Sequence, residues 1–285
     1  MPPVPATPDL PRFRLLLVPE RHALPAGTPS TLRMLVRVQA PERDAADAPR
    51  GPLAIALVLD RSGSMSGAPL AEARACARTI VDRLEPRDRV AVFAFDDEVE
   101  CLAPPTAASE RTRLHDAIDR IFEGGRTDLH GGWRKGADAL AACLVDGGLH
   151  RVVLLSDGCA NEGETDLEAI AAQCRDLARA GVSTSTYGLG RGFNEDLMRA
   201  MARAGRGNGY DGQTAADLAD PFAEEFDLLS SLCAREPVLK LTVPGALAVR
   251  MLNDYEPAGD TPNAWRLPDL AYGSEAWALV EIDVP

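Results

Sequence analysis

The sequence predicts an α/β fold: a Rossmann-like, doubly wound and mostly parallel sheet, with a small flanking all-β domain built from both ends of the chain. Two apolar runs without alternation, 53–59 and 151–156, are typical of strands buried on both faces of a parallel sheet. Strand-like and helix-like segments alternate over 53–234, as in βα units. After Arg235 the pattern changes to short strand-like runs separated by Pro, Gly and Asp.

The α/β region is expected to contain six strands and six helices in alternation. Apolar residues at helical spacing and Pro69 in the first turn predict the first helix, and the acidic turn 96–98 predicts a hairpin. The remaining elements follow from the same periodicities. The expected strands are 53–59, 89–95, 99–102, 151–156, 182–189 and 209–212, and the expected helices are about 69–84, 110–121, 132–144, 167–180, 194–204 and 215–234.

Strand-like runs also lie on both sides of this region. They are 13–18 and 32–38 before it, and 237–243, 247–252, 264–267 and 276–284 after it. The later runs are too few for a stable sandwich, so we expect the earlier runs to pair with them. The predicted division is therefore an N-terminal β segment (1–50), an α/β domain (51–234) and a C-terminal β segment (235–285), with a Pro-rich start (1–11) and a linker at 41–51.

Composition limits the classes of function. The net charge of −13 argues against a nucleic-acid surface and against an anionic membrane face. No apolar run approaches the ~20 residues that span a bilayer, and the N-terminus does not resemble a signal peptide. None of the cysteines forms a CxxC pair, so we interpret them as reduced thiols of a cytoplasmic protein: Cys76, Cys101, Cys143, Cys159, Cys174 and Cys233.

A polar cluster follows the first buried strand. Asp60, Ser62 and Ser64 occupy alternate positions on a tight turn that contains Gly63. The carboxyl ends of strands in open α/β sheets are where ligands bind, and oxygen-only donors suit Mg²⁺, Mn²⁺ or Ca²⁺ better than zinc. The same short pattern also occurs where Asp and Ser side chains cap a helix, so it does not decide the question by itself.

Two further loops place oxygen donors at the same expected edge: Thr127 in GGRTD and Asp157 in LLSDG. With Asp60, Ser62 and Ser64 they form the spaced pattern of a metal-ion-dependent adhesion site. Over roughly 51–234 the sequence resembles a von Willebrand factor type A (VWA) domain. The segments FDDEVECLAPPT, AIDRIFEGGRTDLHGGW, LLSDGCANEGETD and GLGRGFNEDL are similar to the bacterial intracellular-type subfamily often labelled calcium-activated chloride channel homologues, although nothing in the sequence resembles a pore.

The resemblance implies a VWA fold with a divalent cation, Mg²⁺ first, at the top of the sheet. It implies that Ser62 and Ser64 are direct ligands, that Thr127 is a conformation-dependent ligand, and that Asp60 and Asp157 act directly or through water. The family often has Asn where this chain has Asp128. That acid either adds negative charge near the cation or caps the following helix, and we favour the cap.

The resemblance also implies a binding module whose cation accepts an Asp or Glu of a partner protein. Two carboxylates and three neutral hydroxyls do not over-neutralise a dication, so it stays electrophilic. Mg²⁺ readily keeps water ligands, and one of these coordination positions could take a partner's carboxylate. Arg61 and Arg126, with Arg134 as a further candidate, are expected near that acid, although each is also a common kind of surface residue. AAA+ ATPases and regulatory complexes are partners in the broad family.

Three rival interpretations stay open. A hydrolase would use Ser64, His130 and Asp157, with Glu162 or Glu164 as a base, but the chain lacks a G-x-S-x-G elbow and we expect no enzyme. A dinucleotide site at 188–192 (GLGRG) lacks the last required glycine. The third rival is a structural VWA scaffold with a vestigial metal site.

Overall fold

The computed structural model describes residues 13–42, 51–157, 160–189, 193–235, 237–245, 247–253 and 255–284. The chain divides into two compact units: one is Gly51–Asp227, and the other combines Met1–Arg50 with Leu228–Pro285. We call them the α/β unit and the β unit. The predicted Pro-rich start and most of the predicted linker lie outside the described residues, as does Cys159.

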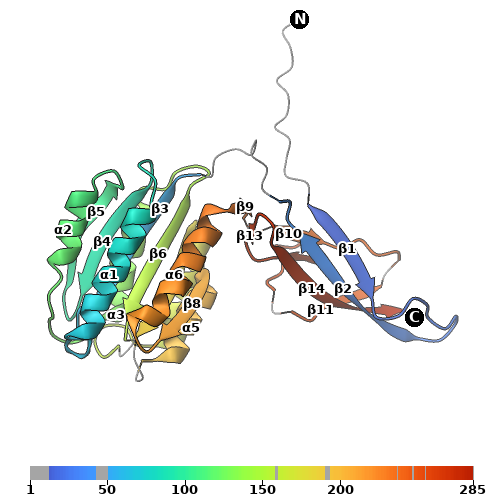
Figure 1. Ribbon diagram of the computed structural model, residues 1–285. Helices are drawn as coiled ribbons and strands as arrows, with labels where there is room; N and C mark the ends of the chain where they lie inside the picture. The colour runs from blue at the N-terminus through green and yellow to red at the C-terminus, as the bar shows by residue number, and fades with distance from the viewer. Residues whose placement is uncertain are drawn as a thin grey trace, which may run out of the picture. The chain divides into compact units, whose positions relative to one another are not determined.

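The α/β unit is built on a six-stranded sheet with the order β5-β4-β3-β6-β7-β8 (Figure 1). All neighbouring strands are parallel except β4 and β5, which form the predicted antiparallel hairpin. The two unalternating runs are β3 and β6, which pair at the centre and are buried at every residue. The strands are β3 (Leu53–Asp60), β4 (Arg89–Phe95), β5 (Val99–Ala107), β6 (Leu149–Ser156), β7 (Val182–Leu189) and β8 (Arg206–Gly212).

Helices cover both faces of this sheet, which confirms the doubly wound prediction. Ala54, Ala56 and Val58 of β3 share one core cluster with residues of α3, α4 and α5. Figure 1 shows α1 and α6 in front of the sheet. The helices are α1 (Ala68–Arg83), α2 (Arg111–Asp119), α3 (Leu129–Ala141), α4 (Leu167–Arg179), α5 (Glu195–Ala204) and α6 (Ala215–Ser230), with a short 3₁₀ turn at Gly63–Met65. No helix among the described residues is long and apolar enough to cross a membrane.

Several element ends differ from the prediction: β5 continues to Ala107 instead of 102, β8 begins at Arg206 instead of 209, and α3 ends at Ala141 instead of 144. Two differences at helix ends have a clear physical reason. α3 begins at Leu129 instead of 132, because the Asp128 side chain caps it by accepting a hydrogen bond from the Gly131 N–H at 2.8 Å. The predicted extension of the last helix to 234 is wrong: α6 ends at Ser230, and β9 (Leu232–Ala234) pairs with β13 (Leu270–Ala271). Pairing with a distant strand overrides helix propensity here.

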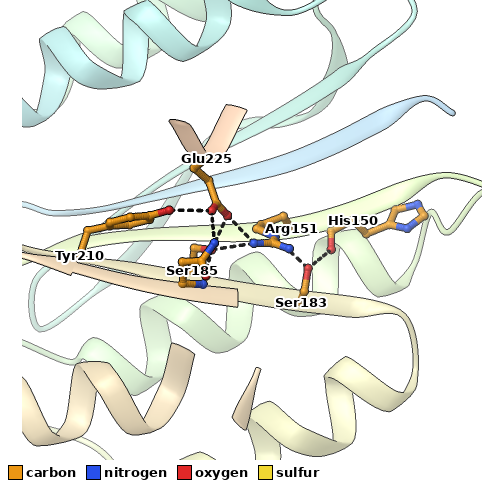
Figure 2. A network of polar contacts seen from close by, with 7 residues as sticks. His150, Arg151, Ser183, Ser185, Tyr210 and Glu225 are labelled. Atoms are coloured by element: carbon orange, nitrogen blue, oxygen red, sulfur yellow. Dashed lines mark hydrogen bonds and ion pairs between the residues drawn. The ribbon is translucent and has the colours of Figure 1, made fainter. Parts of the chain in front are cut away.

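A charged network is buried between the sheet and α6 (Figure 2). Arg151 of β6 and Glu225 of α6 form an ion pair whose side chains are only 5% and 4% exposed. The Arg151 guanidinium also donates to Ser183 Oγ at 3.0 Å and to Ser185 Oγ at 2.9 Å. Glu225 accepts further hydrogen bonds from Ser185, Asn208 and Tyr210. Each charge is therefore both paired and hydrogen-bonded, as a buried ion needs to be.

The β unit contains a four-stranded antiparallel sheet with the order β1-β2-β14-β11. Strands from the two ends of the chain therefore lie side by side in one sheet. One face of β2 and β14 is buried, with Val36, Val38, Ala278 and Val280 in its core. The strands are β1 (Arg14–Pro19), β2 (Ser30–Gln39), β11 (Ala248–Met251) and β14 (Glu275–Val284), and a separate pair joins β10 (Val238–Lys240) to β12 (Ala264–Arg266).

Candidate functional site

Three loops meet at the carboxyl edge of β3 and β6. The first two leave adjacent strands, because Leu59 lies opposite Leu155 in the parallel register, so Asp60 and Asp157 emerge from neighbouring strands. The third loop, 122–128, is joined to the first through main-chain bonds: the Gly124 N–H donates to the Arg61 carbonyl at 2.7 Å. The fold thus brings the predicted site residues to one edge of the sheet.

Asp60 is completely buried at the end of β3. One carboxylate oxygen accepts the Ser62 N–H at 2.8 Å, and the other accepts the hydroxyl of Ser156. Burial raises the pKa of Asp60 to about 6, against the opposing effect of these hydrogen bonds, and the charge of Asp157 raises it further. Asp157 directly follows Ser156, whose hydroxyl bonds to Asp60, so the two acidic residues lie close together.

Asp157 tests whether the predicted donors fit a cation. Its Oδ1 atom is buried and has no hydrogen-bond partner among the described residues. A buried carboxylate oxygen without a partner is costly, and the neighbouring Asp60 charge adds to that cost. A cation held between the two carboxylates would remove both penalties, so the donors present fit a divalent ion.

Three hydroxyls complete the predicted donor set. Ser62 Oγ and Ser64 Oγ lie 3.2 Å apart; Ser62 is buried, whereas Ser64 is exposed. Thr127 is buried, and its N–H donates to Asn161 Oδ1 at 3.0 Å while its carbonyl accepts the N–H groups of Asn161 and Glu162. Ser64 therefore marks the side on which the site is open to solvent.

Hydroxyl donors are essential to this interpretation. Within the described parts of the chain, no group of three His, Cys, Asp or Glu side chains could hold a metal ion. The carboxylates Asp60 and Asp157 would have to be supplemented by Ser62, Ser64 and Thr127. The chemistry of that set is hard and oxygen-only, which suits Mg²⁺ and Ca²⁺.

The arginines predicted to meet a partner are already engaged within the chain. Arg61 binds Asp96 at 3.1 Å and Glu100 at 2.8 Å, and its side chain is 16% exposed. Arg126 is 74% exposed and pairs with Glu162. Arg134 binds Asp138 at 2.9 Å on α3 and Gln173 of α4 at 3.2 Å. Arg126 is thus the more accessible of the two predicted partner contacts.

Sequence reasoning missed the residues that support the site. Ser156 orients Asp60, and Asn161 holds Thr127. Burial raises the pKa of Asp96, but hydrogen bonds from the Glu98 amide and from Arg61 outweigh it and lower the pKa overall. A Cβ on Gly124 would lie 1.7 Å from the Asp96 carboxylate, so a side chain there would push this carboxylate away from Arg61 and from the Gly125 N–H. Of these supporting residues, only Ser156 had a signal in the sequence, because it stands directly before Asp157 in the LLSDG motif.

The rival sites receive no support from these contacts. The His130 ring bonds to Gln173 at 3.0 Å and lies against Trp133, whereas the Ser64 hydroxyl contacts Ser62. Glu162 pairs with Arg126, and Glu164 accepts the Asp166 N–H at 2.9 Å. Residues 190–192 of the suggested dinucleotide loop lie outside the described part of the chain.

Comparison with known proteins gives a consistent family. The sequence profile of the von Willebrand factor type A domain matches residues 54–224. The protein sll0103 of Synechocystis is 29% identical over 225 residues, which cover 78% of this chain and 52% of that protein. YfbK of Escherichia coli is 27% identical over 156 residues, covering 54% of this chain and 27% of YfbK. The chain thus spans about half the length of the first relative and about a quarter of the second.

A solved structure extends the likeness to both units. The von Willebrand factor type A protein from Catenulispora acidiphila has a TM-score of 0.76 to this chain at 18% identity. The match covers 97% of this chain and 66% of that one. At this identity the likeness concerns the fold alone.

Proposed function

Because the chain belongs to the von Willebrand factor type A domain family, a family of protein-interaction modules that are often metal-dependent, we propose that its α/β unit binds a protein partner through a divalent cation. Asp60, Ser62, Ser64, Thr127 and Asp157 would hold the ion. Mg²⁺ is the first candidate, with Mn²⁺ and Ca²⁺ as alternatives. The resemblance to the bacterial intracellular-type subfamily is part of this proposal and rests on sequence motifs.

The buried, unpartnered Asp157 Oδ1 beside Asp60 is the observation that carries the proposal. A bound cation supplies Lewis acidity that attracts an external carboxylate. The chain's own residues do the remaining work: Ser156 and the Ser62 amide orient Asp60, and Asn161 positions Thr127. Exposed Ser64 leaves room for an Asp or Glu of the partner.

The charge around the site narrows the kind of partner. Acidic residues are exposed on the turns and loops near the site: Asp97, Glu98, Glu123 and Glu164. Arg61 does not offset them, because it is already paired with Asp96 and Glu100. A partner surface that is acidic throughout would be repelled. We therefore expect the partner to present one carboxylate to the cation on an otherwise neutral or basic surface. Arg126, which is 74% exposed, would have to release Glu162 to contact that carboxylate.

A non-enzymatic role in the cytoplasm belongs to the same proposal, with an AAA+ ATPase or a regulatory complex as the family-based class of partner. A metal-assisted hydrolase and a scaffold with a vestigial site are the alternatives. A vestigial site gives no reason for a buried carboxylate oxygen without a partner next to a second carboxylate. A hydrolase would need a base beside the cation, but His130 bonds to Gln173 and Glu162 pairs with Arg126.

The cation half of the proposal predicts stabilisation by Mg²⁺. At a concentration one hundred times the dissociation constant, a bound cation should add about 2.7 kcal/mol to the free energy of unfolding, because it binds only the folded site. Thermal unfolding with Mg²⁺ and with EDTA measures this. Ser62→Ala should abolish the increase, and Ser66→Ala, whose hydroxyl contacts Glu123 instead, should keep it. Equal unfolding temperatures in Mg²⁺ and EDTA would reject a functional cation site.

The partner half predicts chelator-sensitive capture from the native host. Cross-linking followed by affinity purification should recover a protein in Mg²⁺ that is lost in EDTA and lost with Asp60→Asn. Arg126→Gln should weaken capture but keep stabilisation by Mg²⁺, because the side chain lies outside the donor set and the substitution adds no negative charge. A partner recovered equally under all these conditions would show that binding uses another surface.

A further inference from the structure

β1 is an edge strand of the four-stranded sheet of the β unit (Figure 1). Among the described residues, no strand pairs with it on the side away from β2. Its side chains are exposed although they are apolar: Leu15 is 58%, Leu17 is 59% and Val18 is 48% exposed. Natural proteins usually guard such edges with charges or cover them, because free main-chain groups invite another strand.

The strand register shows that the exposed leucines belong to the core face. Leu15 lies opposite Val38 and Leu17 lies opposite Val36, and both valines are buried. Directly opposite residues of antiparallel strands project from the same face. The apolar core face of the sheet therefore continues onto β1, where it is left open to solvent.

The other face of the sheet is apolar along the same edge. Val18 lies opposite Leu35, which lies opposite Leu279, so these three residues form one row across β1, β2 and β14. Leu279 is itself 37% exposed. A strand added beside β1 would gain apolar contacts on both faces.

Hydrogen bonding identifies the main-chain groups that point outward. The Glu20 N–H donates to the Arg33 carbonyl at 2.9 Å, toward β2. Because this direction alternates along a strand, the even-numbered residues of β1 face β2, and Leu15, Leu17 and Pro19 face outward. Pro19 has no N–H, so the free edge exposes no donor at that position.

We propose that this edge pairs with β1 of a second copy of the chain, antiparallel about a two-fold axis at Leu17. In that register Leu17 meets its own copy and exchanges both main-chain bonds with it. Leu16 meets Val18, and Leu15 meets Pro19 of the second copy. The interface is isologous, as two-fold dimers require.

Charge selects this register. Arg14 and Glu20, both exposed, flank the apolar stretch, and pairing about Leu17 sets Arg14 of each copy opposite Glu20 of the other. The two residues share the face that carries Val18, because all are even-numbered. An apolar centre would thus be closed at each end by opposite charges, which favours a second copy over an unrelated strand.

Sedimentation equilibrium of the full chain from about 1 to 200 µM, with EDTA present, tests the proposal independently of the cation site. A monomer–dimer equilibrium is expected. Leu17→Lys places two like charges face to face on the axis and should raise the dimer dissociation constant at least about tenfold. Leu144→Lys, at an exposed leucine (45%) of the α/β unit, is the matched control and should not change it.

Charge exchange tests the register. Arg14→Glu and Glu20→Arg should each weaken the dimer, and the double variant should restore it, because the opposite charges then meet again with reversed signs. Circular dichroism melting of each variant checks that the fold is kept. A chain that stays monomeric up to 200 µM, or a dimer insensitive to Leu17→Lys, would overturn the proposal; a dimer lost with Leu17→Lys but not rescued by the double variant would overturn the register.

Discussion

Arg151→Met should lower the free energy of unfolding by about 3–5 kcal/mol, the cost typical of breaking a buried ion pair from one side. The variant keeps a side chain of similar length but leaves Glu225 charged, 4% exposed and without its cation (Figure 2). Ser183 and Ser185 would also lose the donor that reaches them from the guanidinium. Urea unfolding followed by circular dichroism measures the change.

The double variant Arg151→Met/Glu225→Leu tests whether the lost stability comes from the unpaired charge that the single variant leaves buried. Both charges are then gone, so we expect most of the stability to return, as it does when a buried pair is replaced by apolar side chains. Arg78→Met breaks an exposed pair with Asp119 and should cost less than about 1 kcal/mol. A single Arg151→Met variant as stable as the Arg78→Met control would show that water reaches the network.

Asp60→Asn should stabilise the cation-free protein at pH 7.5 by up to about 3 kcal/mol. Folding raises the pKa of Asp60 from 3.8 to about 6, chiefly through burial, so the folded state holds a proton more tightly than the unfolded state. The favourable contribution of Asp60 is complete below pH 3.8 and is lost as the pH rises through about 6. An amide at this position carries no charge, keeps an oxygen for the Ser62 N–H and remains unaffected by pH.

Chemical unfolding at pH 4, 6 and 7.5 in EDTA tests this sign. The advantage of Asp60→Asn over the wild type should be small at pH 4 and grow toward neutrality, and Mg²⁺ should stabilise only the wild type. The variant would then gain stability and lose its response to the cation, a trade-off common at binding sites. A variant less stable than the wild type at pH 7.5 in EDTA would mean that the charged Asp60 side chain does not destabilise the folded protein.

The parts of the fold with strong local signals were predictable from the sequence. The runs at β3 and β6 identified the buried central strands because burial on both faces removes alternation. The acidic turn after Phe95 identified the β4–β5 hairpin. The end of α6 was not predictable, because β9 exists only through its pairing with β13, some 36 residues away in sequence.

The candidate site divides in the same way. The donors recur at short spacing in motifs, so Asp60, Ser62 and Ser64 could be proposed from the chain alone. The contacts that hold them come from distant segments: Ser156 lies 96 positions from Asp60, and Asn161 lies 34 from Thr127. Only the folded sheet brings these pairs together. Whether the assembled donors take up a cation stays a prediction.

The loops around the site are joined to one another by hydrogen bonds within the chain. The Gly63 N–H donates to the Gly125 carbonyl at 3.0 Å, and Thr127 is tied at both its N–H and its carbonyl to 161–162. Little chain entropy remains to be lost when an ion arrives. The rate of cation binding should accordingly be limited by the loss of water from the hydrated ion. We expect fast exchange for Ca²⁺ and slow exchange for Mg²⁺, because Mg²⁺ dehydrates reluctantly.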